Sequence, residues 1–143
     1  MYQSEPSGLW VRDKGDEGVI KQMKDYNSLL AENIEGSRIL DLGGFIGTFA
    51  WWAEKNLYPS HVLSVEPDPS NIELFKKNKG PDTELIEAAV TMKTGDTLPL
   101  YLGKTYRSCN SLESFRGREK VDVKTIGFQD LFDQNHFDVI KCD

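Results

Sequence analysis

A chain of 143 residues is long enough for one domain with a hydrophobic core, and its formal net charge is −6. This acidic balance argues against a nucleic-acid partner, because affinity for phosphates depends on clustered lysine and arginine side chains. The first residues are polar, and no apolar run reaches the roughly 20 residues of a membrane span, so neither a signal peptide nor a membrane protein is expected. With only Cys109 and Cys142, a disulfide framework is not expected, and we predict a cytoplasmic protein with free thiols.

The N-terminal part of the chain predicts a short extended segment followed by one helix. Residues 1–16 are expected to form an N-terminal tail or short hairpin, with turn residues around Gly15. From about residue 17 to residue 34, apolar side chains recur every three or four positions, which is the spacing of one helix face. These apolar positions are Ile20, Met23, Tyr26, Leu30 and Ile34. We expect this helix to cover a sheet and to end near Gly36.

Residues 38–71 carry the pattern of a nucleoside-binding βαβ unit. A short apolar strand stops at the pair Gly43 and Gly44, and the apolar residues after Gly47 form too long a series for another strand. A second apolar strand ends at Glu66, about 20 residues beyond the first glycine. In such a unit the glycine turn lets a ligand approach the backbone, and the acid at the tip of the second strand can accept hydrogen bonds from both ribose hydroxyls.

The rest of the chain alternates between helices and strands. In order, we predict a helix that begins at Asp68–Pro69, a third strand over 85–90, an antiparallel edge strand over 98–102, a strand over 121–125, a short helix over 128–132 and a last parallel strand over 137–142. The fold class is therefore α/β, with a Rossmann-like parallel sheet, flanking helices and an added antiparallel strand pair. The last strand is followed by no helix, so we expect residues 17–143 to be an incomplete domain cut from a longer one.

The glycine turn separates two candidate cofactors. A dinucleotide fingerprint that starts at Gly43 requires glycine where this chain has Phe45 and Thr48. Asp41 would also repel a pyrophosphate at the helix N-terminus, whereas it would attract the ammonium group of S-adenosylmethionine. We therefore predict that Asp41 lies near that ammonium and that Glu66 binds the ribose. Taken singly, Asp41 is better explained as a helix N-terminal acid and Glu66 as a surface acid before a proline, and it is their order around the glycine turn that favours the cofactor site. An NAD-type oxidoreductase remains the alternative.

Four stretches of this sequence together resemble the FkbM-type S-adenosylmethionine-dependent methyltransferases. They are Ile39-Leu-Asp-Leu-Gly-Gly-Phe-Ile-Gly-Thr-Phe, Val65-Glu-Pro-Asp-Pro-Ser-Asn71, Ala88-Ala-Val and Asp138-Val-Ile-Lys-Cys-Asp143. The resemblance runs from about Glu32 to the last residue. It implies a class I methyltransferase architecture and a cofactor site made by Asp41, Gly43, Gly44, Phe45, Gly47, Glu66, Pro67, Ala89 and Asp143.

The chain departs from the family pattern at several positions. Gly44 and Phe45 stand where alanine and asparagine are common, and Gln129 replaces a common aspartate. Family members continue with Glu-Gly after the residue that corresponds to Asp143. The family resemblance suggests a small-molecule acceptor, namely a hydroxyl group on a sugar or other metabolite.

No general base and no metal site can be assigned from the sequence. His61 and His136 both precede strands, so they are expected at the end of the sheet opposite the ligand, and the two cysteines are isolated. Residues 104–120 carry an excess of positive charge, which predicts either a solvated loop or a flap that meets an anionic substrate. A further alternative is a non-catalytic fragment that keeps the fold and pairs its exposed sheet edge with another copy, as a homo-oligomer.

Overall fold

The centre of the fold, in a computed structural model that describes residues 1–103, 110–113, 118–133 and 135–142, is a four-stranded parallel sheet. Its strands are β3 (Arg38–Leu42), β4 (His61–Val65), β5 (Thr83–Ile86) and β9 (Val139–Cys142), in the order β5-β4-β3-β9. The chain moves outward from β3 through β4 to β5 and then returns to β9 on the other side of β3. The strand order therefore reverses between β3 and β9.

A three-stranded sheet lies beside the parallel one. It consists of β6 (Ala89–Thr91), β8 (Lys120–Gly127) and β7 (Thr97–Tyr101), and β8 pairs in parallel with β6 and antiparallel with β7. The predicted antiparallel edge strand is thus confirmed. The predicted single strand over 85–90 is wrong, because the N–H of Ala88 donates to the carbonyl of Ile86 at 3.1 Å. This tight turn separates β5 from β6 and sends the chain into the second sheet.

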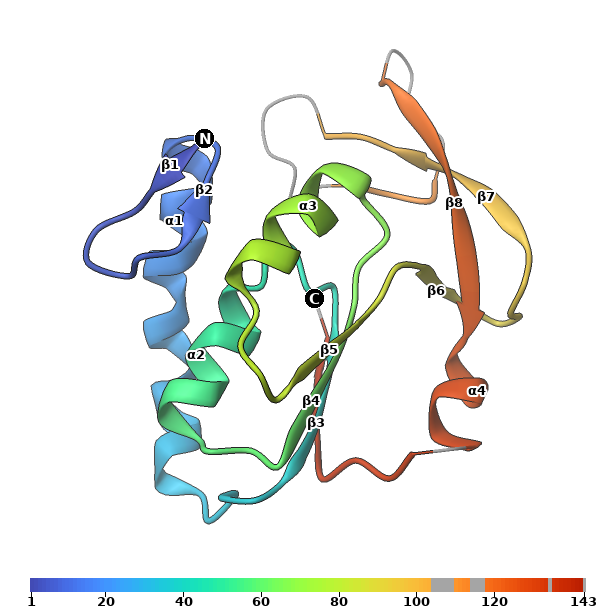
Figure 1. The fold of residues 1–143 in the computed structure, drawn as a ribbon. Helices are drawn as coiled ribbons and strands as arrows, with labels where there is room; N and C mark the ends of the chain where they lie inside the picture. The colour runs from blue at the N-terminus through green and yellow to red at the C-terminus, as the bar shows by residue number, and fades with distance from the viewer. Residues whose placement is uncertain (104–109, 114–117, 134, 143) are drawn as a thin grey trace.

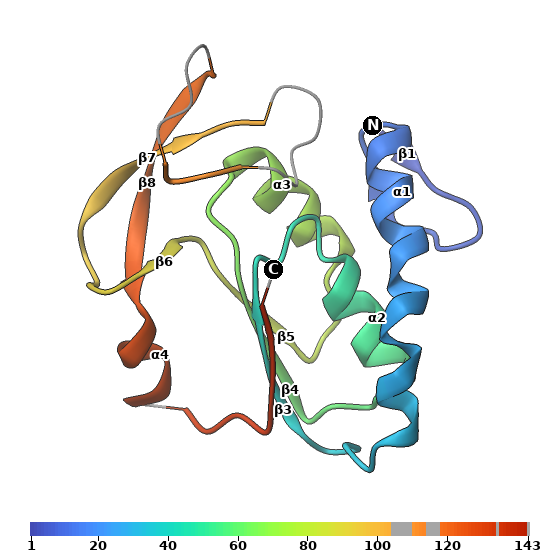
Figure 2. The same ribbon diagram turned by 180° about the vertical axis from the view of Figure 1, so that it is seen from behind.

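Helices cover the two faces of the parallel sheet. They are α1 (Lys14–Gln22), the 3₁₀ helix η1 (Met23–Ala31), α2 (Thr48–Asn56), α3 (Pro69–Asn78) and α4 (Phe128–Asp133). One buried cluster joins Ile39 of the sheet to Phe49 of α2 and Phe75 of α3. A second cluster, on the opposite face, joins Leu40 to Leu131 of α4. Figures 1 and 2 show α1 and α2 on one side of the sheet and α4 with β8 on the other.

The predicted helix over 17–34 is α-helical only in its first half. In the second half, η1 makes three residues per turn, so Met23, Tyr26 and Leu29 line up on one side and pack against the cluster around α2. Leu30, which the 3.6-residue period places on the buried face, is instead 49% exposed. None of the helices in the described ranges is long and apolar enough to cross a membrane.

The N-terminal residues form an antiparallel hairpin of β1 (Tyr2–Gln3) and β2 (Trp10–Val11). The side chain of Asn78 in α3 binds this hairpin, since its Oδ1 accepts the N–H of Trp10 at 2.7 Å and its Nδ2 donates to the Trp10 carbonyl at 3.0 Å. The same Nδ2 donates to the carbonyl of Ile46 at 2.7 Å. One buried amide therefore links the hairpin, α3 and the segment that leads into α2.

Candidate functional site

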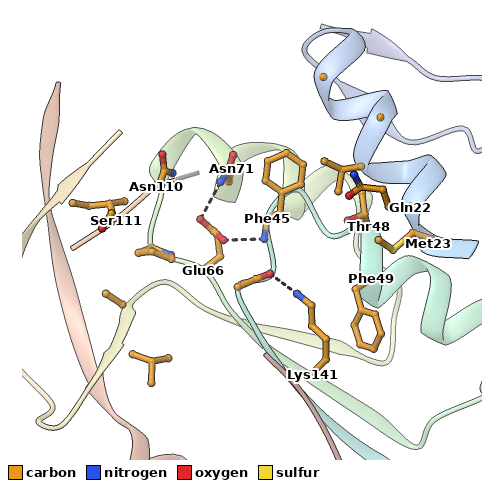
Figure 3. Close-up of a pocket in the computed structure, with 18 of the residues that line it drawn as sticks. Gln22, Met23, Phe45, Thr48, Phe49, Glu66, Asn71, Asn110, Ser111 and Lys141 are labelled. Atoms are coloured by element: carbon orange, nitrogen blue, oxygen red, sulfur yellow. Dashed lines mark hydrogen bonds between the residues drawn. The ribbon is translucent and has the colours of Figure 1, made fainter. Parts of the chain in front are cut away.

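A cavity of about 1160 Å³ opens at the carboxyl ends of β3 and β4. This is the place where ligands bind in open α/β sheets, because the loops of neighbouring strands separate at the point where strand order reverses. Its walls include Gln22 and Met23 on the N-terminal helices and Asn110 and Ser111 on the opposite side (Figure 3). This volume is somewhat above the roughly 300–1,000 Å³ that is typical of pockets for one small molecule.

The glycine turn between β3 and α2 forms one wall of the cavity. Gly43 and Gly47 have φ values of 87° and 86°, which glycine adopts without steric cost. The N–H groups of Gly43 and Gly44 both donate to the carbonyl of Val65, each at 3.0 Å. The turn is therefore attached to the carboxyl end of β4, and Gly43 brings main-chain atoms to the edge of the cavity.

Phe45 lies in this turn with a φ of 51°, a region that side chains other than glycine, asparagine and aspartate rarely occupy. Its ring contributes to the cavity wall and is 7% exposed, and the guanidinium of Arg12 lies 5.4 Å from the ring centroid. The N–H of Phe45 donates to Oε2 of Glu66 at 2.8 Å. Packing of the ring and this hydrogen bond offset the backbone strain.

Gly44 faces the core and does not line the cavity. A Cβ atom at this position would lie 2.8 Å from Cε2 of Phe75 and 3.3 Å from Cβ of Ser64. Since Phe75 is fully buried, neither neighbour has room to move away.

We expect Gly44→Ala to lower the free energy of unfolding by about 1–3 kcal/mol, as overpacking of a core does. Denaturant unfolding followed by circular dichroism measures this change. The control is Gly18→Ala within α1, where a Cβ meets nothing within 4 Å. That variant should be more stable by up to about 1 kcal/mol, because alanine favours a helix over glycine. Equal stabilities of the two variants would contradict the packing argument.

Glu66 presents a buried carboxylate to the cavity. Its Oε1 accepts hydrogen bonds from the N–H of Asp68 at 2.9 Å and from Nδ2 of Asn71 at 3.0 Å, and its Oε2 accepts the N–H of Phe45. Burial raises the pKa of Glu66 to about 7 although these hydrogen bonds lower it, and the negative charge of Asp68 raises it further. Each carboxylate oxygen can accept two hydrogen bonds, so Oε2 retains capacity for a ligand hydroxyl.

Asp41 does not reach the cavity. Its side chain is 0% exposed, its Oδ2 accepts the hydroxyl of Ser64 at 2.9 Å, and its Oδ1 lies 2.9 Å from Nζ of Lys141. The predicted direct contact of Asp41 with a ligand ammonium is therefore not available in this geometry. The reason is the register of the sheet, because Asp41 and Lys141 are directly opposite on β3 and β9.

Lys141 is a site residue that the sequence patterns missed. Its Nζ donates to the carbonyl of Gly43 at 2.8 Å, and its side chain lines the cavity (Figure 3). A lysine within an otherwise apolar strand was the available signal, because lysine is rarely buried unless it is paired. The pairing partner could not be named before the order β3-β9 was known.

The other predicted site residues divide into two groups. Pro67 and Ala89 line the cavity together with Gly43, Phe45 and Glu66, whereas Gly47 does not. Asp143 and the charged residues Lys104, Arg107 and Arg116 lie outside the described residues. Within the described ranges, no cluster of histidine, cysteine, aspartate and glutamate could hold a metal ion.

These features define a Rossmann-like α/β domain with an open ligand site at the switch point of its parallel sheet. The site combines a glycine turn, a buried carboxylate at the tip of the second strand and a buried lysine–aspartate pair. It differs from a dinucleotide site, because the ring of Phe45 stands where a glycine would let a pyrophosphate approach the backbone.

No protein-family model and no curated protein matches this chain. Among solved structures it is similar to a Pyrococcus horikoshii protein provisionally described as an RNA methyltransferase, with 25% identity, a TM-score of 0.38 and coverage of 46% of this chain and 33% of that one. A Listeria monocytogenes protein, provisionally described as an S-adenosylmethionine-dependent methyltransferase, has 16% identity, a TM-score of 0.39 and coverage of 58% and 37%.

A third similar structure is M. jannaschii TYW2 in complex with AdoMet, with 22% identity, a TM-score of 0.37 and coverage of 54% of this chain and 34% of that one. The matched segments span only about a third of the length of these three proteins. TM-scores this low carry no argument about function.

Proposed function

We propose that the cavity binds S-adenosylmethionine and that the chain is part of a methyltransferase. The observation that carries the proposal is Glu66, a buried carboxylate beside a glycine turn whose Oε2 keeps hydrogen-bonding capacity on the cavity side. This group suits the hydroxyls of a ribose. The resemblance of the sequence to the FkbM type supports the same cofactor.

The residues around Glu66 fit the parts of this cofactor. Gly43 offers main-chain atoms to the amino-acid end, and Pro67 and Ala89 would flank the base. When bound, S-adenosylmethionine supplies an electrophilic methyl group on a sulfonium. The role of this chain is then to hold and orient the cofactor and to keep water from the methyl group. Correct positioning of the reacting groups supplies most of the rate enhancement of such a displacement.

The acceptor that we propose is a hydroxyl group on a sugar or another small metabolite. The cavity is large enough for a second small molecule beside the cofactor. On its far side, Asn110 and Ser111 carry polar groups that can bind hydroxyls. Asn110 is held in place because its Nδ2 donates to Oδ2 of Asp68 at 2.7 Å and its Oδ1 accepts the N–H of Gly103 at 2.8 Å.

Calorimetric titration tests the cofactor. We expect S-adenosylhomocysteine to bind at one site, because Glu66 suits its ribose. NADH should give no heat, because the ring of Phe45 obstructs its pyrophosphate. Binding of NADH without binding of S-adenosylhomocysteine would overturn the proposal in favour of an oxidoreductase. Leu98→Ala, on β7 at a side chain outside the cavity wall, is the control and should bind S-adenosylhomocysteine as the unmodified chain does.

A further inference from the structure

We propose that Lys141 is a positioning residue that sets the shape of the glycine turn, and that Asp41 holds the ammonium of Lys141 in place for this role. The proposal rests on the proposed function in one respect, namely that the turn holds the amino-acid end of the ligand. The structural link is the hydrogen bond of 2.8 Å from Nζ of Lys141 to the carbonyl of Gly43. Nζ also forms the ion pair of 2.9 Å with Asp41.

Both members of the ion pair between Lys141 and Asp41 are buried. The side chain of Lys141 is 8% exposed and that of Asp41 is 0% exposed, so both charges are removed from water. A buried ion pair recovers its desolvation cost only with good geometry and further hydrogen bonds, and an apolar pair in its place is often as stable. Stability alone therefore does not account for a lysine and an aspartate at these positions.

The further hydrogen bonds of this ion pair connect it to the glycine turn that forms one wall of the cavity. Asp41 receives the hydroxyl of Ser64 on β4, and Lys141 on β9 donates to Gly43, which follows β3. The N–H of Gly43 is held in turn by the carbonyl of Val65 on β4. The residue that opens the turn is thus held through its N–H by one neighbouring strand and through its C=O by the other.

Gly43 would lose one of these two restraints without Lys141. Its φ of 87° lies in a region where glycine is free to move to other conformations, so nothing in the residue itself keeps the carbonyl in place. The next two N–H groups of the turn, those of Gly44 and Phe45, bind Val65 and Glu66. Displacement of the Gly43 carbonyl is therefore expected to loosen the hydrogen bond that orients Glu66 as well.

The double variant Asp41→Asn/Lys141→Met separates positioning from stability. It removes both charges together, so no unpaired buried charge remains, and it also removes the donor to Gly43. The matched control is Lys79→Met, because Lys79 also donates its Nζ to a main-chain carbonyl, that of Thr83 at 3.1 Å, but far from the cavity wall.

Amide hydrogen exchange without ligand is the first readout. In the double variant, the amides of Gly44 and Phe45 should exchange about tenfold faster relative to the core amide of Val62, because local opening of the turn becomes easier. Val62 is a suitable reference because its N–H is bonded to the carbonyl of Asp82 at the opposite end of the sheet. In Lys79→Met these ratios should not change.

Binding of S-adenosylhomocysteine is the second readout, and we expect about a tenfold loss of affinity in the double variant and none in Lys79→Met. If the exchange rates of Gly44 and Phe45 rise by the same factor as that of Val62 in the double variant, the positioning role is wrong. A pair that contributes only to global stability would raise the exchange rates of all core amides by the same factor. Unchanged affinity in a folded double variant would overturn the positioning role as well. If the unmodified chain does not bind S-adenosylhomocysteine, the proposed function fails, while the exchange ratios still decide the role of Lys141.

Discussion

Lys141→Met is expected to lower the free energy of unfolding by about 3–5 kcal/mol, the cost of breaking a buried ion pair by removal of one partner. The variant leaves the carboxylate of Asp41 at 0% exposure with the Ser64 hydroxyl but without its cation at 2.9 Å. Methionine offers no hydrogen-bond donor in place of the lost ammonium, so the buried carboxylate keeps its charge without a partner of opposite sign. Equilibrium unfolding in urea measures the change, provided that the variant still unfolds in one transition.

The two control variants make this prediction specific to burial. Lys79→Met removes an exposed lysine and should change the free energy of unfolding by less than about 0.5 kcal/mol. The double variant Asp41→Asn/Lys141→Met should be more stable than Lys141→Met alone, since it no longer buries an unpaired charge. A loss below about 1 kcal/mol for Lys141→Met would show that the pair is exposed to water in solution.

The stability of the protein is expected to fall by about 3 kcal/mol as the pH rises from 4.5 through 7, on account of Glu66 alone. Burial raises the pKa of Glu66 from 4.5 to about 7 in the folded state. Between these values the folded chain holds a proton that the unfolded chain has released, so the free energy of unfolding decreases with pH. The contribution is fully present below pH 4.5 and is lost above pH 7.

Glu66→Gln isolates this contribution, because glutamine has no proton to release. Denaturation curves at several pH values between 4 and 8 should show that the variant lacks the part of the slope that belongs to Glu66. The difference in stability between the variant and the unmodified chain should therefore shift in favour of the variant as the pH rises. A constant difference across this range would place the pKa of Glu66 near its ordinary value.

Ligand hydroxyls favour the ionised carboxylate, so affinity for S-adenosylhomocysteine should decline below pH 7.

The parts of the fold that sequence patterns predicted are the ones encoded locally. The apolar strand before Gly43, the strand that ends at Glu66 and the capped start of α3 at Asp68–Pro69 all lie as expected, because each depends on neighbours within a few residues. The hydrogen bond from Phe45 to Glu66 brings the two ends of the predicted βαβ pattern together. Periodicity and glycine position are sufficient for this part of the site.

The differences from the sequence predictions arise where distant or competing contacts decide. An apolar spacing of three and four residues is compatible with an α-helix and with a 3₁₀ helix, so the sequence pattern does not show that η1 turns Leu30 outward. The sequence pattern assigns Asp41 to the ligand from its charge and from its place before the glycine turn, and neither of these shows that the side chain is already paired. Its partner Lys141 lies on a strand whose position beside β3 follows from the sheet order and not from any local pattern.

The bond between Lys141 and Gly43 also has a consequence for how the protein is made. The two residues are 98 positions apart, so the glycine turn in the cavity wall depends on one of the longest-range contacts of the chain. During synthesis, β3, α2 and β4 leave the ribosome well before β9 and can pair with one another first. At that stage β3 is paired with β4 on one side only, and Asp41 lies on an edge strand that Lys141 has not yet reached. Docking of β9 brings the ammonium of Lys141 to Asp41 and to the carbonyl of Gly43 in the same step, so this part of the cavity wall forms only when β9 has joined the sheet.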